Sequence, residues 1–261
     1  MEELKNGLGA FYNENGLLDL SPMHSCINSI SCWMYIKESR KINSDWGMYY
    51  PYIGGKYQEA RILVTGINMN GFGDPNAEDL LVKQAIKEIS EGKKRTFAKE
   101  GYRGSLLWHR LLSYSVYILR EINILPKNDR PYPTIRELQT AIDYISVTNS
   151  IKCSPNDENS NDNSRPSYEM WNNCPKFILK KEIEILKPKY LIVLGKLNFS
   201  YLKNLFNVDE MSFIGEVKSR RFYDDTVDFC AYGIPHPSSS MGTSIIRMDE
   251  FEKLLIGQFG S

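Results

Sequence analysis

Four short runs of apolar residues divide the chain, and each stops at a glycine or a polar side chain. The runs are Ala60–Thr65, Tyr144–Thr148, Tyr190–Leu194 and Val227–Tyr232. Uninterrupted apolar runs of this length are typical of strands that are buried on both faces of a parallel sheet. Open α/β sheets bind ligands beyond the carboxyl ends of such strands. The pattern therefore predicts a site formed by the residues that follow the runs.

Segments with helical spacing separate the apolar runs. Ser105–Glu121 carries apolar residues at i, i+4, i+7 and i+11, which indicates one buried helical face. Other helices are expected at Ala77–Ile89, Thr134–Ile142, Pro175–Lys187, Phe199–Leu205 and Ile245–Ile256. This alternation predicts an α/β fold of three layers, with a central four-stranded parallel sheet and helices on both faces.

The chain shows no internal repeat and no long linker, so residues 1–261 are expected to form a single domain. Residues 1–55 have weak periodicity, and we expect a turn-rich segment packed on that domain. Ser154–Ser167 is rich in Asn, Asp and Ser and is expected to be a solvated loop.

The formal net charge is zero, which removes the simplest argument for nucleic-acid binding, a strongly basic domain. A local basic stretch, Lys93–Arg103, contains Phe97 and Tyr102, and it has two interpretations: a phosphate contact or a solvated face. The sequence contains neither a membrane span of about 20 apolar residues nor a signal peptide. We therefore expect a soluble, cytoplasmic protein with no membrane partner.

Three side chains follow the runs and suit one ligand. Asn68 and Asn149 offer amide donors and acceptors, and His236 offers a donor to a developing negative charge. This set suits a flat ring with several hydrogen-bonding groups, such as a nucleobase. The loop Gly66–Gly73 fits neither a phosphate-binding P-loop nor a dinucleotide fingerprint, so no nucleotide cofactor is expected.

Four motifs resemble, in order, those of the uracil-DNA glycosylase superfamily: Gly66–Gly73, Val147–Cys153, Leu191–Gly195 and His236–Ser238. The first is closest to the mismatch-specific and single-strand-selective branches, and the second resembles the iron–sulfur branch with its Thr-Asn-x-x-Lys-Cys. The resemblance covers roughly residues 55 to 240. It implies a monomeric hydrolase of base-excision repair, which removes uracil or a related damaged base from DNA after base flipping.

The resemblance also implies roles for individual residues. Asn68 would position the attacking water, and His236 would hydrogen-bond the base oxygen where negative charge develops. The substrate would be bound by Gly66, Ile67, Phe72, Tyr102, Asn149 and Ser238. In that set Asn149 reads the edge of uracil, an aromatic ring stacks on the base, and Ser238 contacts a phosphate. Simpler roles stay open: a turn residue for Asn68, a helix cap for Asn149 and a backbone contact for His236.

The first motif departs from the superfamily pattern. Met69 and Asn70 stand where proline and glycine are usual. The iron–sulfur branch carries a carboxylate in this motif, and Ile67 occupies the neighbouring position. These departures leave a second hypothesis, a catalytically weak or inactive relative that binds nucleic acid or a nucleotide. A third hypothesis treats the fold as a scaffold for an unrelated function.

No disulfides are expected among the five cysteines, since nothing in the sequence indicates secretion. The iron–sulfur branch has two early cysteines and two that flank the second motif. By that resemblance Cys26, Cys32, Cys153 and Cys174 would hold a 4Fe–4S cluster, with His24 as a substitute ligand. Five residues separate Cys26 from Cys32, where the branch has two, so four unrelated reduced thiols are the alternative. Cys230 is expected to be a small buried apolar residue.

Overall fold

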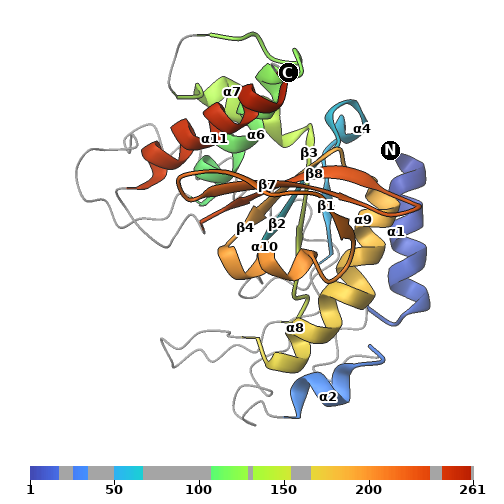
Figure 1. Ribbon diagram of the computed structural model, residues 1–261. Helices are drawn as coiled ribbons and strands as arrows, with labels where there is room; N and C mark the ends of the chain where they lie inside the picture. The colour runs from blue at the N-terminus through green and yellow to red at the C-terminus, as the bar shows by residue number, and fades with distance from the viewer. Residues whose placement is uncertain are drawn as a thin grey trace, which may run out of the picture.

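The computed structural model describes residues 1–17, 26–34, 50–66, 107–128, 132–153, 166–235 and 243–259. Within these residues eight strands form one sheet in the order β1-β3-β2-β4-β8-β7-β5, and β6 pairs with β7 (Figure 1). The strands are β1 (Tyr52–Ile53), β2 (Ile62–Gly66), β3 (Ile145–Asn149), β4 (Tyr190–Leu194), β5 (Asn207–Val208), β6 (Ser212–Ile214), β7 (Val217–Tyr223) and β8 (Asp228–Ile234).

The expected parallel core of four strands is confirmed. β2 pairs in parallel with β3 on one side and β4 on the other, and β4 pairs in parallel with β8. The sheet is larger than expected, because β1 adds to β3 and β7 adds to β8 in antiparallel orientation. A tight turn joins β7 to β8, in which Asp224 accepts hydrogen bonds from the backbone N–H groups of Thr226 and Val227.

The helices match most of the expected segments. They are α1 (Glu2–Glu14), α2 (Ser29–Trp33), α4 (Tyr57–Ala60), α6 (Leu107–Glu121), α7 (Ile135–Ile142), α8 (Tyr168–Cys174), the π-helical η3 (Pro175–Leu179), α9 (Lys180–Leu186), α10 (Lys196–Leu202) and α11 (Thr243–Phe259). The expected helix Ala77–Ile89 lies outside the described residues, as does most of the expected loop Ser154–Ser167. α10 begins and ends three residues before the expected Phe199–Leu205.

Two expectations about local structure were wrong. Residues 2–14 are not turn-rich but form α1, whose buried face includes Leu8 and Tyr12. The helix expected to begin at Pro175 begins at Tyr168, capped by the Ser167 hydroxyl, which accepts from the Met170 N–H. Pro175 lies inside this longer helix, at the first position of its π-helical turn, where the missing N–H of proline and the altered hydrogen-bond spacing coincide.

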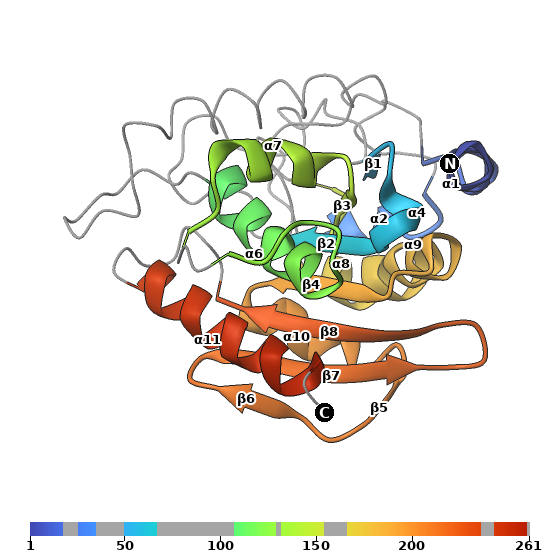
Figure 2. The same cartoon turned by 90° about the horizontal axis from the view of Figure 1, so that it is seen from above.

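The two faces of the sheet are covered by different helices. α6, α7 and α11 pack on the face that presents Ile62 and Val64, whereas α9 and α10 pack on the face that presents Leu63 (Figures 1 and 2). This division follows from the two-residue period of a strand. α1 lies against α9. No helix in the described part of the chain is long and apolar enough to cross a membrane.

Candidate active site at the carboxyl edge of the sheet

The carboxyl ends of the four parallel strands lie side by side. Gly66 at the end of β2 is in register with Asn149 at the end of β3, and Leu194 of β4 is in register with Ile234 of β8. The Gly195 N–H, one residue beyond β4, donates to the Ile234 carbonyl at 2.7 Å. Residues far apart in the sequence therefore reach one edge of the sheet, as the pattern of apolar runs predicted.

Of the residues assigned to substrate and catalysis, the structure describes Gly66 and Asn149, and it brings them together. The others lie outside the described residues, as do the basic stretch Lys93–Arg103 and His24: these are Ile67, Asn68, Phe72, Tyr102, His236 and Ser238. The described chain stops at this edge, at Gly66 and at Pro235, directly before the segments that carry Asn68 and His236.

Gly66 and Asn149 share a tight space. A Cβ atom at Gly66 would lie 2.6 Å from Oδ1 of Asn149, so the missing side chain leaves room for the carboxamide. Asn149 is only 3% exposed, and its Nδ2 has no hydrogen-bond partner among the described residues. Buried polar groups are nearly always paired, so the partner of this donor lies outside the described residues.

The segment that follows Asn149 contributes Lys152 to a buried ion pair. Lys152 contacts Glu182 of α9 at 2.7 Å, and both side chains are fully buried. Glu182 also accepts hydrogen bonds from Thr148, at 2.9 Å, and from the Tyr12 hydroxyl. Burial lowers the pKa of Lys152, and the charge of Glu182 opposes that effect.

This network joins β3, α1 and α9 through side chains that sequence reasoning did not single out. In the sequence, Lys152 stands out only as the lysine of the Thr-Asn-x-x-Lys-Cys motif, and Glu182 belongs to no motif. One signal was present, because Glu182 lies among the apolar positions Leu179, Ile183 and Leu186 of its helix. A carboxylate on a buried helical face requires a cationic or hydrogen-bonding partner.

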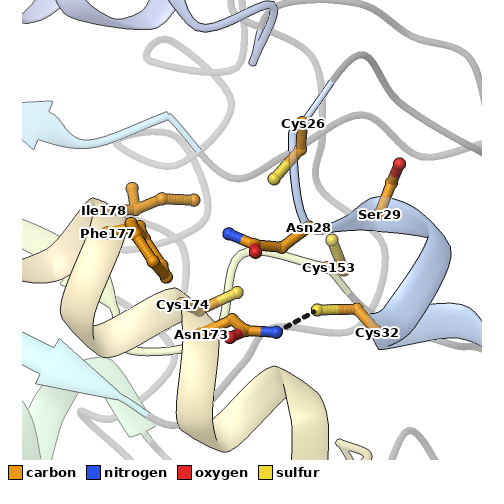
Figure 3. A pocket seen from close by; sticks show the side chains of 9 residues that line it. All are labelled: Cys26, Asn28, Ser29, Cys32, Cys153, Asn173, Cys174, Phe177 and Ile178. Carbon is orange, nitrogen blue, oxygen red and sulfur yellow. Dashed lines mark hydrogen bonds between the residues drawn. The ribbon is translucent and has the colours of Figure 1, made fainter.

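Four cysteines line a single pocket beside this network: Cys26, Cys32, Cys153 and Cys174. Figure 3 shows their sulfur atoms facing the same space. Cys32 lies in α2 and Cys174 ends α8, while Cys153 follows β3 by four residues. The Ser29 N–H donates to the Cys26 carbonyl at 2.8 Å, closing a turn that brings Cys26 and Cys32 to the same pocket.

The pocket contains hydrogen-bond donors to sulfur. Nδ2 of Asn173 lies 3.5 Å from the Cys32 sulfur, and the Lys152 backbone N–H donates to the Cys174 sulfur. Burial raises the pKa of Cys174 to about 12 despite that donor, and burial also raises the pKa values of Cys26 and Cys32. Within the described residues, no three His, Cys, Asp or Glu side chains are arranged to hold a metal ion.

The fifth cysteine is separate from this pocket. Cys230 lies on β8 and is half-buried rather than buried, and its thiol lies 3.6 Å from Oε1 of Gln258 in α11. The expectation of a buried apolar residue was therefore wrong in part: Cys230 packs against the core, but its thiol faces a polar residue of the last helix. None of the five cysteines is in a disulfide.

Comparison with known proteins agrees with this architecture. A search of curated protein sequences found no match. The family model described as the uracil DNA glycosylase superfamily matches residues 70–255, which is more than half of the chain. The superfamily consists of DNA glycosylase-like hydrolases, whose fold is a sheet with helices on both faces. By this match and this fold, the chain belongs to the uracil-DNA glycosylase superfamily.

Proposed function

We propose that the protein is a monofunctional DNA glycosylase that hydrolyses the N-glycosidic bond of uracil or a related damaged base in DNA. The observation that carries this proposal is the buried amide donor of Asn149 beside Gly66, which has no partner among the residues that the structure describes. An uncharged donor of this kind fits a carbonyl oxygen of a neutral ring better than a phosphate, which favours Arg or Lys.

We assign base recognition to Asn149. Its Nδ2 would donate to O4 of uracil, and its Oδ1 would accept from N3–H. Leaving a buried donor unpaired costs about 1–3 kcal/mol, and binding of the base removes that cost. A base with an amino group at the same position would present a donor to a donor, so the arrangement favours deaminated bases.

We assign the chemical step to Asn68 and His236, with their roles as the superfamily resemblance implies. The bond between C1′ and the base nitrogen breaks, and its electron pair leaves with the base. The anion that forms places charge on the base oxygen, to which His236 donates a hydrogen bond. Water positioned by the Asn68 carbonyl adds to the cationic C1′, and the proton it loses neutralises the released base anion. A neutral amide suffices because little nucleophilic assistance is needed in such a dissociative reaction.

The remaining assignments concern the DNA around the flipped base. Phe72 or Tyr102 would stack on the ring, and the backbone of Gly66 and Ile67 would line its edge. The Ser238 hydroxyl would contact a flanking phosphate. Aromatic stacking contributes about 1–3 kcal/mol per base, which helps to offset the cost of unstacking.

We also propose that the four-cysteine pocket holds a 4Fe–4S cluster with a structural role. Among the described residues, the lining contains four thiols and neither a histidine nor a carboxylate, and thiolates are the ligands that iron–sulfur clusters use. One tetrahedral ion at about 2.3 Å from each sulfur requires the sulfurs to lie within about 3.8 Å of each other. A four-iron cluster takes one thiolate per iron and therefore accepts a wider arrangement. Its ligands would tie residues 26–34 to β3 and α8.

A second candidate function is binding of DNA or a nucleotide without turnover. The departures at Ile67, Met69 and Asn70 in the first motif favour it. In that case the base would be bound as described, but the attacking water would not be positioned. Tight binding of uracil-containing DNA without release of the base is its signature.

A cleavage assay tests the proposal. The purified protein is incubated with single- and double-stranded oligonucleotides that contain one uracil or one hypoxanthine, followed by alkali. We expect strand cleavage at the modified position, lost in Asn149→Leu and in Asn68→Ala. Loss in these variants also excludes a contaminating glycosylase. Asn207→Ala, at an exposed asparagine of β5, is the matched control and retains activity. Absence of cleavage with every deaminated base rejects the proposal.

A further inference from the structure

The side chain of Asn198 joins the two strand ends that form the candidate site. Asn198 is the third residue of α10 and is 1% exposed. Its Nδ2 donates to the carbonyl oxygen of Gly66 at 3.0 Å and to that of Thr65 at 3.4 Å. Its Oδ1 accepts a hydrogen bond from the Ser150 hydroxyl. One carboxamide on a third element therefore contacts both the end of β2 and the residue after β3.

Two further contacts complete this group. The Ser150 N–H donates to the Gly66 carbonyl at 3.0 Å, and the hydroxyls of Ser150 and Thr65 lie 3.2 Å apart. We refer to the hydrogen bonds among Asn198, Ser150, Thr65 and Gly66 as the Asn198 brace. Within the brace, both the donor and the acceptor of the Asn198 amide have partners. By contrast, the amide donor of Asn149, the residue before Ser150, is unpartnered among the described residues.

The Asn198 brace fixes the residues that surround the Asn149 side chain. Asn149 lies opposite Gly66 in the sheet and directly precedes Ser150, so both of its neighbours in space are fixed by Asn198. The clearance between Asn149 and Gly66 is small, and a shift of either strand end changes the direction of the carboxamide. Buried and fully satisfied networks of this kind are rigid.

We propose that Asn198 is a positioning residue for base recognition. It holds Gly66 and Ser150 so that the Asn149 amide is aimed at the base before the base arrives. Preorganisation of this kind removes the ordering cost from the binding step. The inference rests on the proposed function for its consequence, but its structural part, a restrained Asn149, is independent of any activity.

A binding experiment tests the consequence. Two oligonucleotides are compared, one with 2′-fluoro-2′-deoxyuridine and one with a tetrahydrofuran abasic analogue at the same position. The fluorine slows cleavage because it destabilises the cation at C1′, so binding is measured without turnover. The dissociation constant of the abasic oligonucleotide divided by that of the fluorouridine oligonucleotide reports recognition of the base alone. We expect Asn198→Ala and Ser150→Ala to reduce this ratio roughly five- to tenfold and to leave affinity for the abasic oligonucleotide within about twofold.

Two variants on the same helix separate positioning from general loss of stability. Leu202→Ala removes a buried leucine of α10 that belongs to the core and whose apolar side chain makes none of the hydrogen bonds of the brace. It is expected to lower the melting temperature and to keep the binding ratio of the wild type. Ser200→Ala removes an exposed hydroxyl that donates to the Lys196 carbonyl of the same helix, and it is expected to change neither quantity. Equal loss of affinity for both oligonucleotides in Asn198→Ala overturns the proposal.

Hydrogen exchange provides a readout that needs no substrate. Residues 145–153 should exchange faster in Asn198→Ala than in Leu202→Ala under conditions of equal global stability. Unchanged protection of this segment in Asn198→Ala overturns the inference whatever the protein binds. If wild-type protein has no preference for the base but the exchange result is as expected, the proposed function fails and the restraint on Asn149 is upheld.

Discussion

The Cβ position of Gly66 lies 2.6 Å from Oδ1 of Asn149, so the asparagine side chain occupies space that any other residue at position 66 would need. The two residues are in register at the ends of β2 and β3. The Asn149 amide can therefore keep its orientation only if residue 66 is a glycine. The backbone torsion of Gly66 is not in the left-handed region, so the requirement is one of space.

Gly66→Ala should therefore impair activity more than stability. The added methyl group displaces the Asn149 carboxamide, and a misplacement of about 1 Å at an active site costs on the order of 100-fold in rate. We expect kcat/KM for a uracil oligonucleotide to fall by about that factor. Gly55→Ala is the matched control, because a Cβ at Gly55 meets nothing within 4 Å. Equal activity of the two variants would contradict the steric argument.

Asn149→Leu should abolish base recognition without loss of stability. The substitution keeps the approximate volume and removes a buried donor that has no partner among the described residues. An unpaired buried group costs about 1–3 kcal/mol, so the free energy of unfolding should stay constant or rise by about 1 kcal/mol. Urea denaturation checks this expectation. A decrease of more than about 1 kcal/mol would show that the amide is satisfied in the free protein.

Separating the Lys152–Glu182 pair should be costly. Glu182→Leu leaves a buried ammonium without its counter-charge, and removal of one partner of such a pair destabilises by about 3–5 kcal/mol. The double variant Lys152→Met/Glu182→Leu should recover most of that loss, because no buried charge remains. Urea denaturation measures both, and Glu182→Gln serves if the leucine variant does not fold. A double variant that is no more stable than Glu182→Leu would contradict this prediction.

A surface pair provides the control for that experiment. Lys253 and Asp249 of α11 lie 2.7 Å apart, but both side chains are more than half exposed. Solvent screens such pairs, so Lys253→Met should leave the free energy of unfolding unchanged within the error of the measurement.

Acid stability should depend on Glu137. Burial favours its neutral form, but hydrogen bonds from the Thr134 N–H and from the Arg120 guanidinium outweigh burial and lower its pKa. A lowered carboxyl pKa contributes stability above the unfolded value of about 4.3 and loses it as the pH falls through the folded value. The unfolding free energy should therefore fall with pH below about 5, and fall less in Glu137→Gln. Glu59→Gln, at an exposed carboxylate, should keep the wild-type dependence.

The cysteine pocket yields a prediction that is independent of activity. Anaerobically purified protein should contain about four irons per chain and absorb broadly in the visible range. Cys153→Ala and Cys174→Ala should lose this absorption. Cys230→Ala should keep it, because Cys230 lies on β8 beside Gln258 and not in the pocket. Folded wild-type protein without iron would refute the cluster, and one equivalent of zinc would indicate a single-ion site instead.

The apolar runs were sufficient to predict the parallel core. A strand buried on both faces needs consecutive apolar residues, and that requirement is local, so Ile62–Gly66 and Tyr190–Leu194 can be recognised without knowledge of their partners. The same holds for α7, whose Thr134 and Glu137 form a capping box within four residues. The adjacency of Gly66 and Asn149 follows from parallel pairing of these strands.

Local patterns did not predict α1 or the start of the helix at Tyr168. Amphipathic spacing was present in residues 2–14 but was masked by the polar residues around it. Local sequence preference places proline at the start of a helix, and Pro175 instead lies in a π-helical turn inside one. The position of this turn therefore depends on the surrounding packing. Tertiary contacts override such preferences.

The sequence by itself determined the four parallel strands, the order of the motifs that follow them and the residue types at the edge of the sheet, because each depends on neighbours along the chain. Only the tertiary structure decided that Asn198 contacts Gly66 and Ser150, and that Glu182 meets Lys152. These partners are brought together from different elements by packing. A buried polar residue reveals its role only when the atoms that satisfy it are in place.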